Sequence, residues 1–64
     1  MKISKEKINM QLARKQMTVT ALAEKYGVSR PRMTIILGNR ELTPVCVGRL
    51  AQALGVDITE ILED

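Results

Sequence analysis

The side chains that could carry chemistry in this sequence are mostly cations, because its 64 residues include no histidine and a single cysteine, Cys46. Without histidine, neither a Ser-His nor a Cys-His nucleophile can form. A structural zinc site would lack its usual imidazole and thiolate ligands, and a lone cysteine cannot form an internal disulfide. We therefore expect a binding protein, not an enzyme, with no cofactor and no metal.

The positive charge is concentrated in the first two thirds of the chain. Residues 1–40 carry nine lysines and arginines against two glutamates, a net charge of +7, whereas residues 41–64 carry one arginine against five acidic residues, a net charge of −4. A molecule divided in this way can present its basic end to a polyanion such as nucleic acid. The alternative is a solvated surface with uneven charge.

Length and composition limit the class of protein. A chain of this length forms one small domain, and 45% hydrophobic with 27% charged residues is typical of a globular one. No apolar run is long enough to span a membrane, and none follows the basic N-terminus as in a secretory signal. We expect a single domain over residues 1–64, located in the cytoplasm, with no membrane partner and no small-molecule ligand.

Capping residues and apolar spacing predict five helical segments and no strand. The expected segments are residues 4–15, 19–26, 30–37, 44–54 and 58–62. The short polar side chains expected to cap them are Ser4, Thr18, Ser29, Thr43 and Asp57. Gly27 and Gly55 are expected to end the second and fourth segments, because glycine suits the left-handed conformation found there.

Apolar spacing also predicts which side chains face the core. In the first segment, Ile8 and Leu12 define the inward stripe, while Gln11 and Arg14 are expected to face outward. Lys2, Lys5 and Lys7 are expected to form a solvated edge of this segment, with a phosphate contact by one of them as the alternative.

Other apolar and sulfur-containing residues are expected to pack in or beside the core. Met10, Met17 and Met33 favour packing over a cofactor site, and Cys46 is expected to be partly buried. The apolar residues of the fifth segment should close the core over the first helix, with a subunit interface as the alternative. These residues are Ile58, Ile61 and Leu62.

The second and third segments are joined by only three residues, Gly27-Val28-Ser29, so the two helices should pack at a steep angle. This arrangement needs a small residue at the closest approach, Ala23, and a residue free to adopt positive φ, Gly27. The apolar residues that would hold the angle are Leu22, Tyr26, Val28, Met33 and Ile36. The stretch TVTALAEKYGVSRPRMTIILGNR, followed by residues 50–56 and 58–62, resembles the lambda-repressor-like, Cro-type (XRE) helix-turn-helix family over residues 5–63.

This resemblance implies an all-α, compact five-helix DNA-binding domain with its helix-turn-helix at residues 18–39. It further implies that residues 30–37 enter the major groove of double-stranded DNA. The side chains that would face bases by position are Arg30, Pro31, Arg32, Thr34 and Ile35. Those that would hold phosphates are Thr18, Thr20, Asn39 and Arg40.

The types of these side chains limit what they could recognise. Arg30 can donate two hydrogen bonds to guanine, and Ile35 can contact a thymine methyl group. Many relatives have a phosphate-binding glutamine where this sequence has Val19, so Thr18 or Thr20 would have to replace that contact. Pro31 has no donor and would position Arg30 rather than read a base.

These inferences predict a transcriptional regulator, most simply a repressor of phage or mobile-element type that acts by occupying its operator. One domain of this size contacts only about half a dozen base pairs. We therefore expect a homodimer on a two-fold operator, joined through the acidic and apolar C-terminal end. The alternative is a helical protein-interaction or antitoxin-like module, for which an exposed apolar patch and weak salt dependence would be expected.

Overall fold

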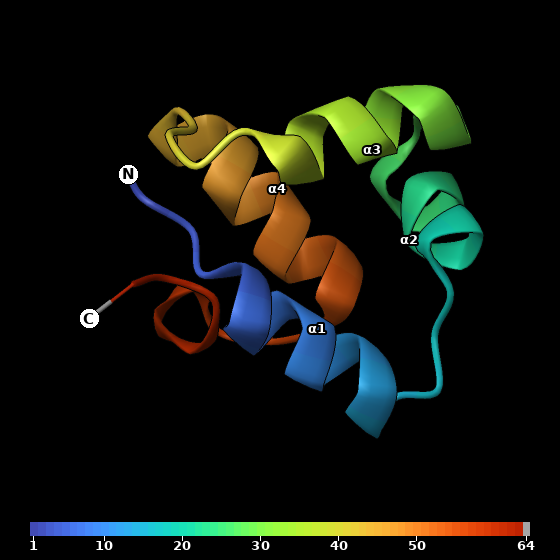
Figure 1. Cartoon of the computed structure of the whole chain (residues 1–64), viewed down its shortest axis with the longest axis horizontal. Helices are drawn as coiled ribbons and strands as arrows, with labels where there is room; N and C mark the ends of the chain where they lie inside the picture. Colours follow the sequence, from blue (N-terminus) through green and yellow to red (C-terminus); the bar gives the residue numbers. More distant parts are fainter. Residues whose placement is uncertain (64) are drawn as a thin grey trace.

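The computed structural model describes residues 1–63 as four α-helices and one short 3-10 turn (Figure 1). The elements are α1 (Lys5–Arg14), α2 (Val19–Tyr26), α3 (Arg30–Gly38), α4 (Pro44–Leu54) and the 3-10 turn η1 (Ile58–Glu60). The predicted all-α class is confirmed, and residues 1–63 contain no strand beyond two isolated bridges. The predicted count of five helices is not confirmed.

The expected fifth helix over residues 58–62 is only the turn η1. Asp57 and Glu60 form the predicted capping box around it, and the N–H of Ile61 bonds back to the carbonyl of Ile58. Residues 61–63 then pair with the N-terminal segment: Ser4 N–H donates to the Ile61 carbonyl at 2.7 Å, and Glu63 N–H donates to the Lys2 carbonyl at 3.0 Å. The backbone groups that would have continued the helix are satisfied across the molecule.

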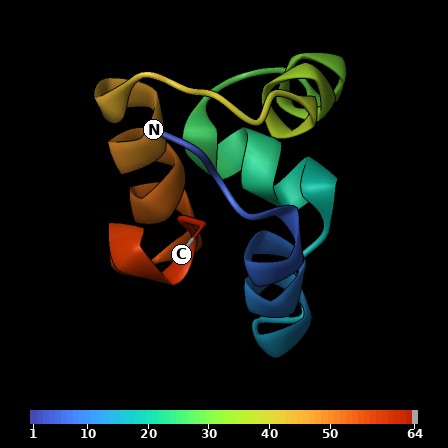
Figure 2. The same ribbon diagram turned by 60° about the vertical axis from the view of Figure 1, so that its left-hand side comes forward.

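The N-terminal segment also reaches the loop that follows α3. Ile3 N–H donates to the Arg40 carbonyl at 2.9 Å, and Leu42 N–H donates to the Met1 carbonyl at 2.9 Å. Figure 2 shows this segment passing between the α3–α4 loop and the C-terminal turn. Sequence periodicity gave no sign of this arrangement, because the segment is too short to have a period.

The predicted caps of α1 to α4 are confirmed by their hydrogen bonds. Each of the four hydroxyl groups accepts from the backbone N–H three residues later. Pro31 and Pro44 lie in the first turns of α3 and α4, where a missing N–H is tolerated. Gly27 and Gly55 adopt φ values of 96° and 73°, so both left-handed helix ends are confirmed.

The core forms where α2 packs against both α3 and α4, and it is closed by α1 and the C-terminal segment. Leu22, Met33 and Leu50 are completely buried at this junction, each from a different helix. Ile61 is buried and Leu62 is partly buried, as expected of residues that close the core, whereas Ile58 is 37% exposed. None of the helices within residues 1–63 has the length and apolar character needed to cross a membrane.

Three predictions on the first helix are wrong. Gln11, expected outside, is buried, and it lines one hollow beside α1 together with Glu60 of η1. Met10, expected in or beside the core, is 58% exposed, since its position on α1 lies outside the Ile8–Leu12 stripe. Lys7 is not a fully solvated edge residue: it is partly buried, and its ammonium donates to the Leu62 carbonyl at 2.9 Å.

Candidate nucleic-acid interface

The outward face of α3 consists of the five side chains predicted to face bases. Met33 and Ile36 are buried against the rest of the molecule, which fixes the opposite face of the helix toward solvent. The exposed residues on that face are Arg30, Pro31, Arg32, Thr34 and Ile35. Their predicted exposure is confirmed, whereas their contacts with bases remain a prediction.

Local hydrogen bonds at the start of α3 determine what this face can offer. Ser29 caps the helix through the N–H of Arg32, at 3.4 Å. The Thr34 hydroxyl donates back to the Arg30 carbonyl at 3.1 Å, so its hydrogen is already engaged. Thr34 can therefore offer lone pairs and a methyl group to a base, but no free donor in this rotamer.

Arg30 and Arg32 point to different surroundings. Arg32 lines a hollow of about 320 Å³ between α3 and the start of α4, together with Asn39 and Thr43. Arg30 lines none of the hollows described here and stands at the free end of α3. The two guanidinium groups therefore lie in different surroundings: Arg30 stands at the start of α3, and Arg32 lies toward the loop after α3.

Three of the four predicted phosphate-binding side chains are exposed and available. Thr18 accepts from the Ala21 N–H at 3.1 Å, which leaves its own hydroxyl hydrogen free to donate. Thr20 and Asn39 are exposed, at the start of α2 and the end of α3. The first N–H groups of α2 add to this surface, because a helix N-terminus attracts anions.

The fourth predicted side chain, Arg40, has a partner within the chain. Its Nη2 lies 2.6 Å from Oε1 of Glu63, and this contact raises the pKa of the Arg40 guanidinium. The side chains are 70% and 33% exposed, so the pair is solvated. Sequence reasoning missed it, because no spacing rule connects two residues 23 positions apart.

A second feature missed from the sequence fixes the end of α2 to α4. The Arg49 guanidinium lies 4.5 Å from the centre of the Tyr26 ring and donates to the Tyr26 carbonyl at 3.1 Å. The Tyr26 hydroxyl and the Cys46 sulfur are hydrogen-bonded at 3.1 Å, and Cys46 is partly buried as predicted. Burial, and then the hydrogen bond with Cys46, raises the pKa of the Tyr26 phenol. Arg49 and Cys46 thus hold Tyr26 directly before the turn that leads into α3.

The described residues bring together no group of three His, Cys, Asp or Glu side chains that could bind a metal ion. The groups exposed on the surface around α3 are cations, hydroxyl groups and one isoleucine side chain.

Comparison with known protein families gives an independent finding. The family model for the Cro/C1-type HTH DNA-binding domain matches residues 7–64, which include α2, the turn and α3. No curated protein and no solved structure matches the chain.

Proposed function

Because the chain belongs to the Cro/C1-type helix-turn-helix DNA-binding domain family, we propose that it binds specific double-stranded DNA sequences and thereby regulates transcription. The observation that carries this proposal is the exposed face of α3, which presents Arg30 and Ile35 while Met33 and Ile36 anchor the opposite face. A helix held in this way can enter the major groove with its first turn on base edges.

Each exposed side chain of α3 has a proposed role. Arg30 donates to guanine, and Ile35, which is 57% exposed, contacts a thymine methyl group. Thr34 accepts from a base or contacts a methyl group, and Pro31 fixes the backbone that carries Arg30. Arg32 reaches either a base or a phosphate from the hollow that it lines together with Asn39 and Glu41.

Phosphates on either side of the groove would be held by the start of α2 and the end of α3. Thr18 and Thr20 would donate from α2, where Val19 replaces the glutamine found in many relatives. Asn39 and Arg40 would donate from the other side, Arg40 after leaving Glu63. Contacts of this kind orient a protein on the duplex but do not read sequence.

We further propose that the protein is a repressor that acts in the cytoplasm by occupying its operator as a homodimer. One α3 covers too few base pairs for useful specificity, so a second copy would supply the other half-site. The C-terminal end is the proposed interface, because Ile58 is 37% exposed there beside the acidic residues Asp57 and Glu60.

Charge reversal on α3 tests the proposal. A preferred DNA sequence is first obtained by selection from a random pool, and its binding is then measured by fluorescence anisotropy. The double variant Arg30→Glu, Arg32→Glu should lose this binding with its helical circular dichroism unchanged. The matched control Lys2→Glu, Lys5→Glu changes the net charge equally away from α3 and should retain most of the affinity.

Wild-type affinity should also fall steeply as salt is raised, because phosphate contacts release counterions. If the α3 variant binds as well as the wild type and salt has little effect, the groove assignment is wrong. That result would favour the protein-interaction module.

A further inference from the structure

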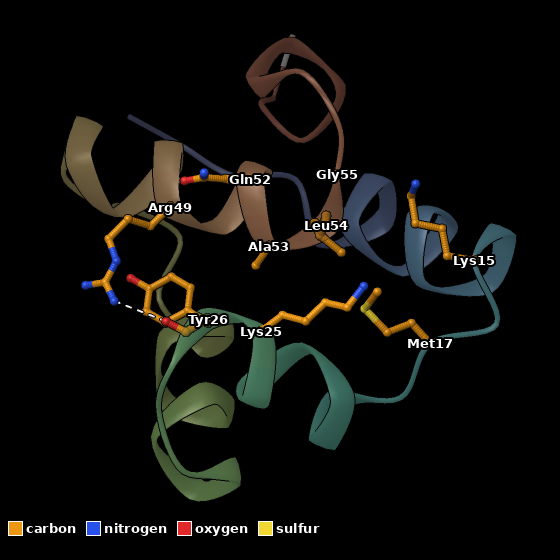
Figure 3. Close-up of a pocket in the computed structure, with 9 residues that line it drawn as sticks. All are labelled: Lys15, Met17, Lys25, Tyr26, Arg49, Gln52, Ala53, Leu54 and Gly55. Atoms are coloured by element: carbon orange, nitrogen blue, oxygen red, sulfur yellow. Dashed lines mark hydrogen bonds between the residues drawn. The ribbon is translucent and has the colours of Figure 1, made fainter.

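A second basic surface lies outside the proposed DNA interface, in a cleft of about 760 Å³. The end of α1, one side of α2 and the second half of α4 form its walls (Figure 3). Lys15, Lys25 and Arg49 contribute positive charge to it, and no acidic residue lines it. None of its lining residues belongs to α3, although Tyr26 and Arg49 also line the neighbouring hollow to which Arg32 contributes.

The three cations are held differently. Arg49 is fixed on the Tyr26 ring, and only its Nη2 is used in the bond to the Tyr26 carbonyl, which leaves other N–H donors available. The Lys15 ammonium lies near the C-terminal end of α4, 3.6 Å from the place a Cβ would take at Gly55. Among residues 1–63, neither Lys15 nor Lys25 forms a hydrogen bond or an ion pair.

The apolar part of the cleft lies between these charges. Figure 3 shows the Lys25 and Met17 side chains reaching toward each other, with the buried Leu54 and Ala53 on the α4 side and the Arg49–Tyr26 pair at the other end. Lys25 thus extends its aliphatic stem along apolar surface and keeps its ammonium in solvent. The cleft offers apolar contact in the middle and positive charge around it.

We propose that this cleft binds an acidic peptide segment of a partner protein. Two or more carboxylates of the segment pair with Lys15, Lys25 and Arg49, and one apolar side chain between them packs on the partly buried Met17. A phosphate backbone could use the cations but would leave this apolar surface without a partner. A peptide with acidic and apolar residues satisfies both parts.

This inference does not depend on DNA binding. Because α3 does not line the cleft, a peptide could be bound while α3 lies in the groove. The cleft would then serve to bring a second protein to the DNA-bound regulator.

The probe for the test is a dye-labelled peptide of sequence Glu-Glu-Leu-Glu-Glu-Phe-Glu-Glu, with a second peptide in which every glutamate is glutamine. Binding to the full chain is measured by fluorescence anisotropy. The variant Lys15→Gln, Lys25→Gln removes two cations from the cleft, and the control Lys2→Gln, Lys5→Gln removes two elsewhere. All four lysines are exposed, so both variants should fold, which circular dichroism checks.

The acidic peptide should bind the wild type, and the glutamine peptide at least about tenfold more weakly. The cleft variant should lose about tenfold in affinity and the control less than about twofold. In amide NMR spectra the peptide should shift the signals of Met17 and Ala53. DNA affinity should fall no more in the cleft variant than in the control.

Three results would overturn the proposal. The first is absence of peptide binding. The second is an equal loss in both variants, which would indicate attraction by net charge alone. The third is a loss of DNA affinity in the cleft variant as large as in the α3 charge-reversal variant, which would make the cleft part of the DNA surface. Only failure of the α3 variant to lose DNA binding would count against the proposed function itself.

Discussion

Thr34 and Arg40 are exposed residues whose hydrogen bonds within the chain limit what they can offer to DNA. Thr34 gives its hydroxyl hydrogen to the Arg30 carbonyl, and Arg40 pairs with Glu63. The two cases differ in how easily DNA can change them. A hydroxyl can rotate, and an exposed ion pair adds little stability and is readily exchanged for a phosphate.

Replacing Glu63 with glutamine should therefore strengthen DNA binding a few-fold. The substitution frees Arg40 and removes a negative charge that lies close to it. With one more cation available, the slope of log affinity against log salt should steepen by about one. Fluorescence anisotropy over a salt series measures both effects.

Glu6→Gln is the matched control, because it removes one exposed glutamate from the first turn of α1. An equal gain in both variants would show that net charge, and not release of Arg40, is responsible.

Helical spacing was sufficient to predict which side of α3 is exposed, because the apolar residues on the buried side of a helix recur at regular intervals along the sequence. It could not predict the partners of Arg40 and Arg49. Those contacts join segments 23 positions apart, and they depend on how the elements pack. The burial of Gln11 escaped prediction for the same reason.

The turn between α2 and α3 depends on Gly27, whose φ of 96° is rarely adopted by other residues. Gly27→Ala should destabilise the protein by about 1–2 kcal/mol, because the left-handed conformation brings Cβ close to the backbone. A Cβ at this position would meet no other atom within 4 Å, so the cost lies in the backbone alone.

Gly48→Ala in the interior of α4 should have the opposite effect. A Cβ there also meets nothing within 4 Å, and the backbone is helical. The variant should gain about 0.5–1 kcal/mol, since alanine favours helix more than glycine does. Urea denaturation followed by circular dichroism compares the two variants, and changes of the same sign would contradict this explanation of the turn.

The turn η1 should make stability depend on pH through Asp57. Hydrogen bonds from the side chain and then the backbone of Thr59 lower the pKa of Asp57 in the folded state. Since the unfolded carboxyl titrates near pH 3.9, the stabilisation is fully present above that pH. It is lost as the pH falls through the lower pKa of the folded state.

Thermal denaturation between about pH 5 and pH 2 should therefore show a smaller pH dependence for Asp57→Asn than for the wild type. The asparagine keeps an acceptor for the cap but has no charge to lose. Identical pH dependence in the two proteins would show that Asp57 is not stabilised as a carboxylate.

The bounds of α2 and α4 could be predicted to the residue, because each has a hydroxyl cap at one end and a left-handed glycine at the other. The fifth segment has an equally clear cap but no helical continuation. The backbone groups of residues 61 and 63 instead form hydrogen bonds with residues 2–4. Nothing in the local sequence indicates this pairing. Capping residues thus predict where the helices begin, whereas backbone hydrogen bonds to a distant segment determine that the last one ends after a single turn.

In the whole molecule, the N-terminal segment connects the loop after α3 to the C-terminal turn. The segment therefore lies between the proposed phosphate contact Arg40 and the end proposed as the dimer interface. The sequence alone shows how charge is divided along the chain. It does not show that Lys15, Lys25 and Arg49 lie around one cleft. Those residues come from α2, α4 and the position directly after α1, and only the packing of the helices brings them together.

Selection of bound sequences from a random pool of double-stranded DNA, run side by side with the wild type and Arg30→Ala, most directly tests whether α3 reads DNA. We expect the wild type to enrich an inverted repeat with half-sites roughly 34 Å apart. At one position of each half-site, the preference of the protein for guanine over the other bases should be about 1–3 kcal/mol smaller in the variant than in the wild type. If the wild type enriches no sequence, or if every base preference survives the loss of Arg30, α3 does not read DNA as proposed.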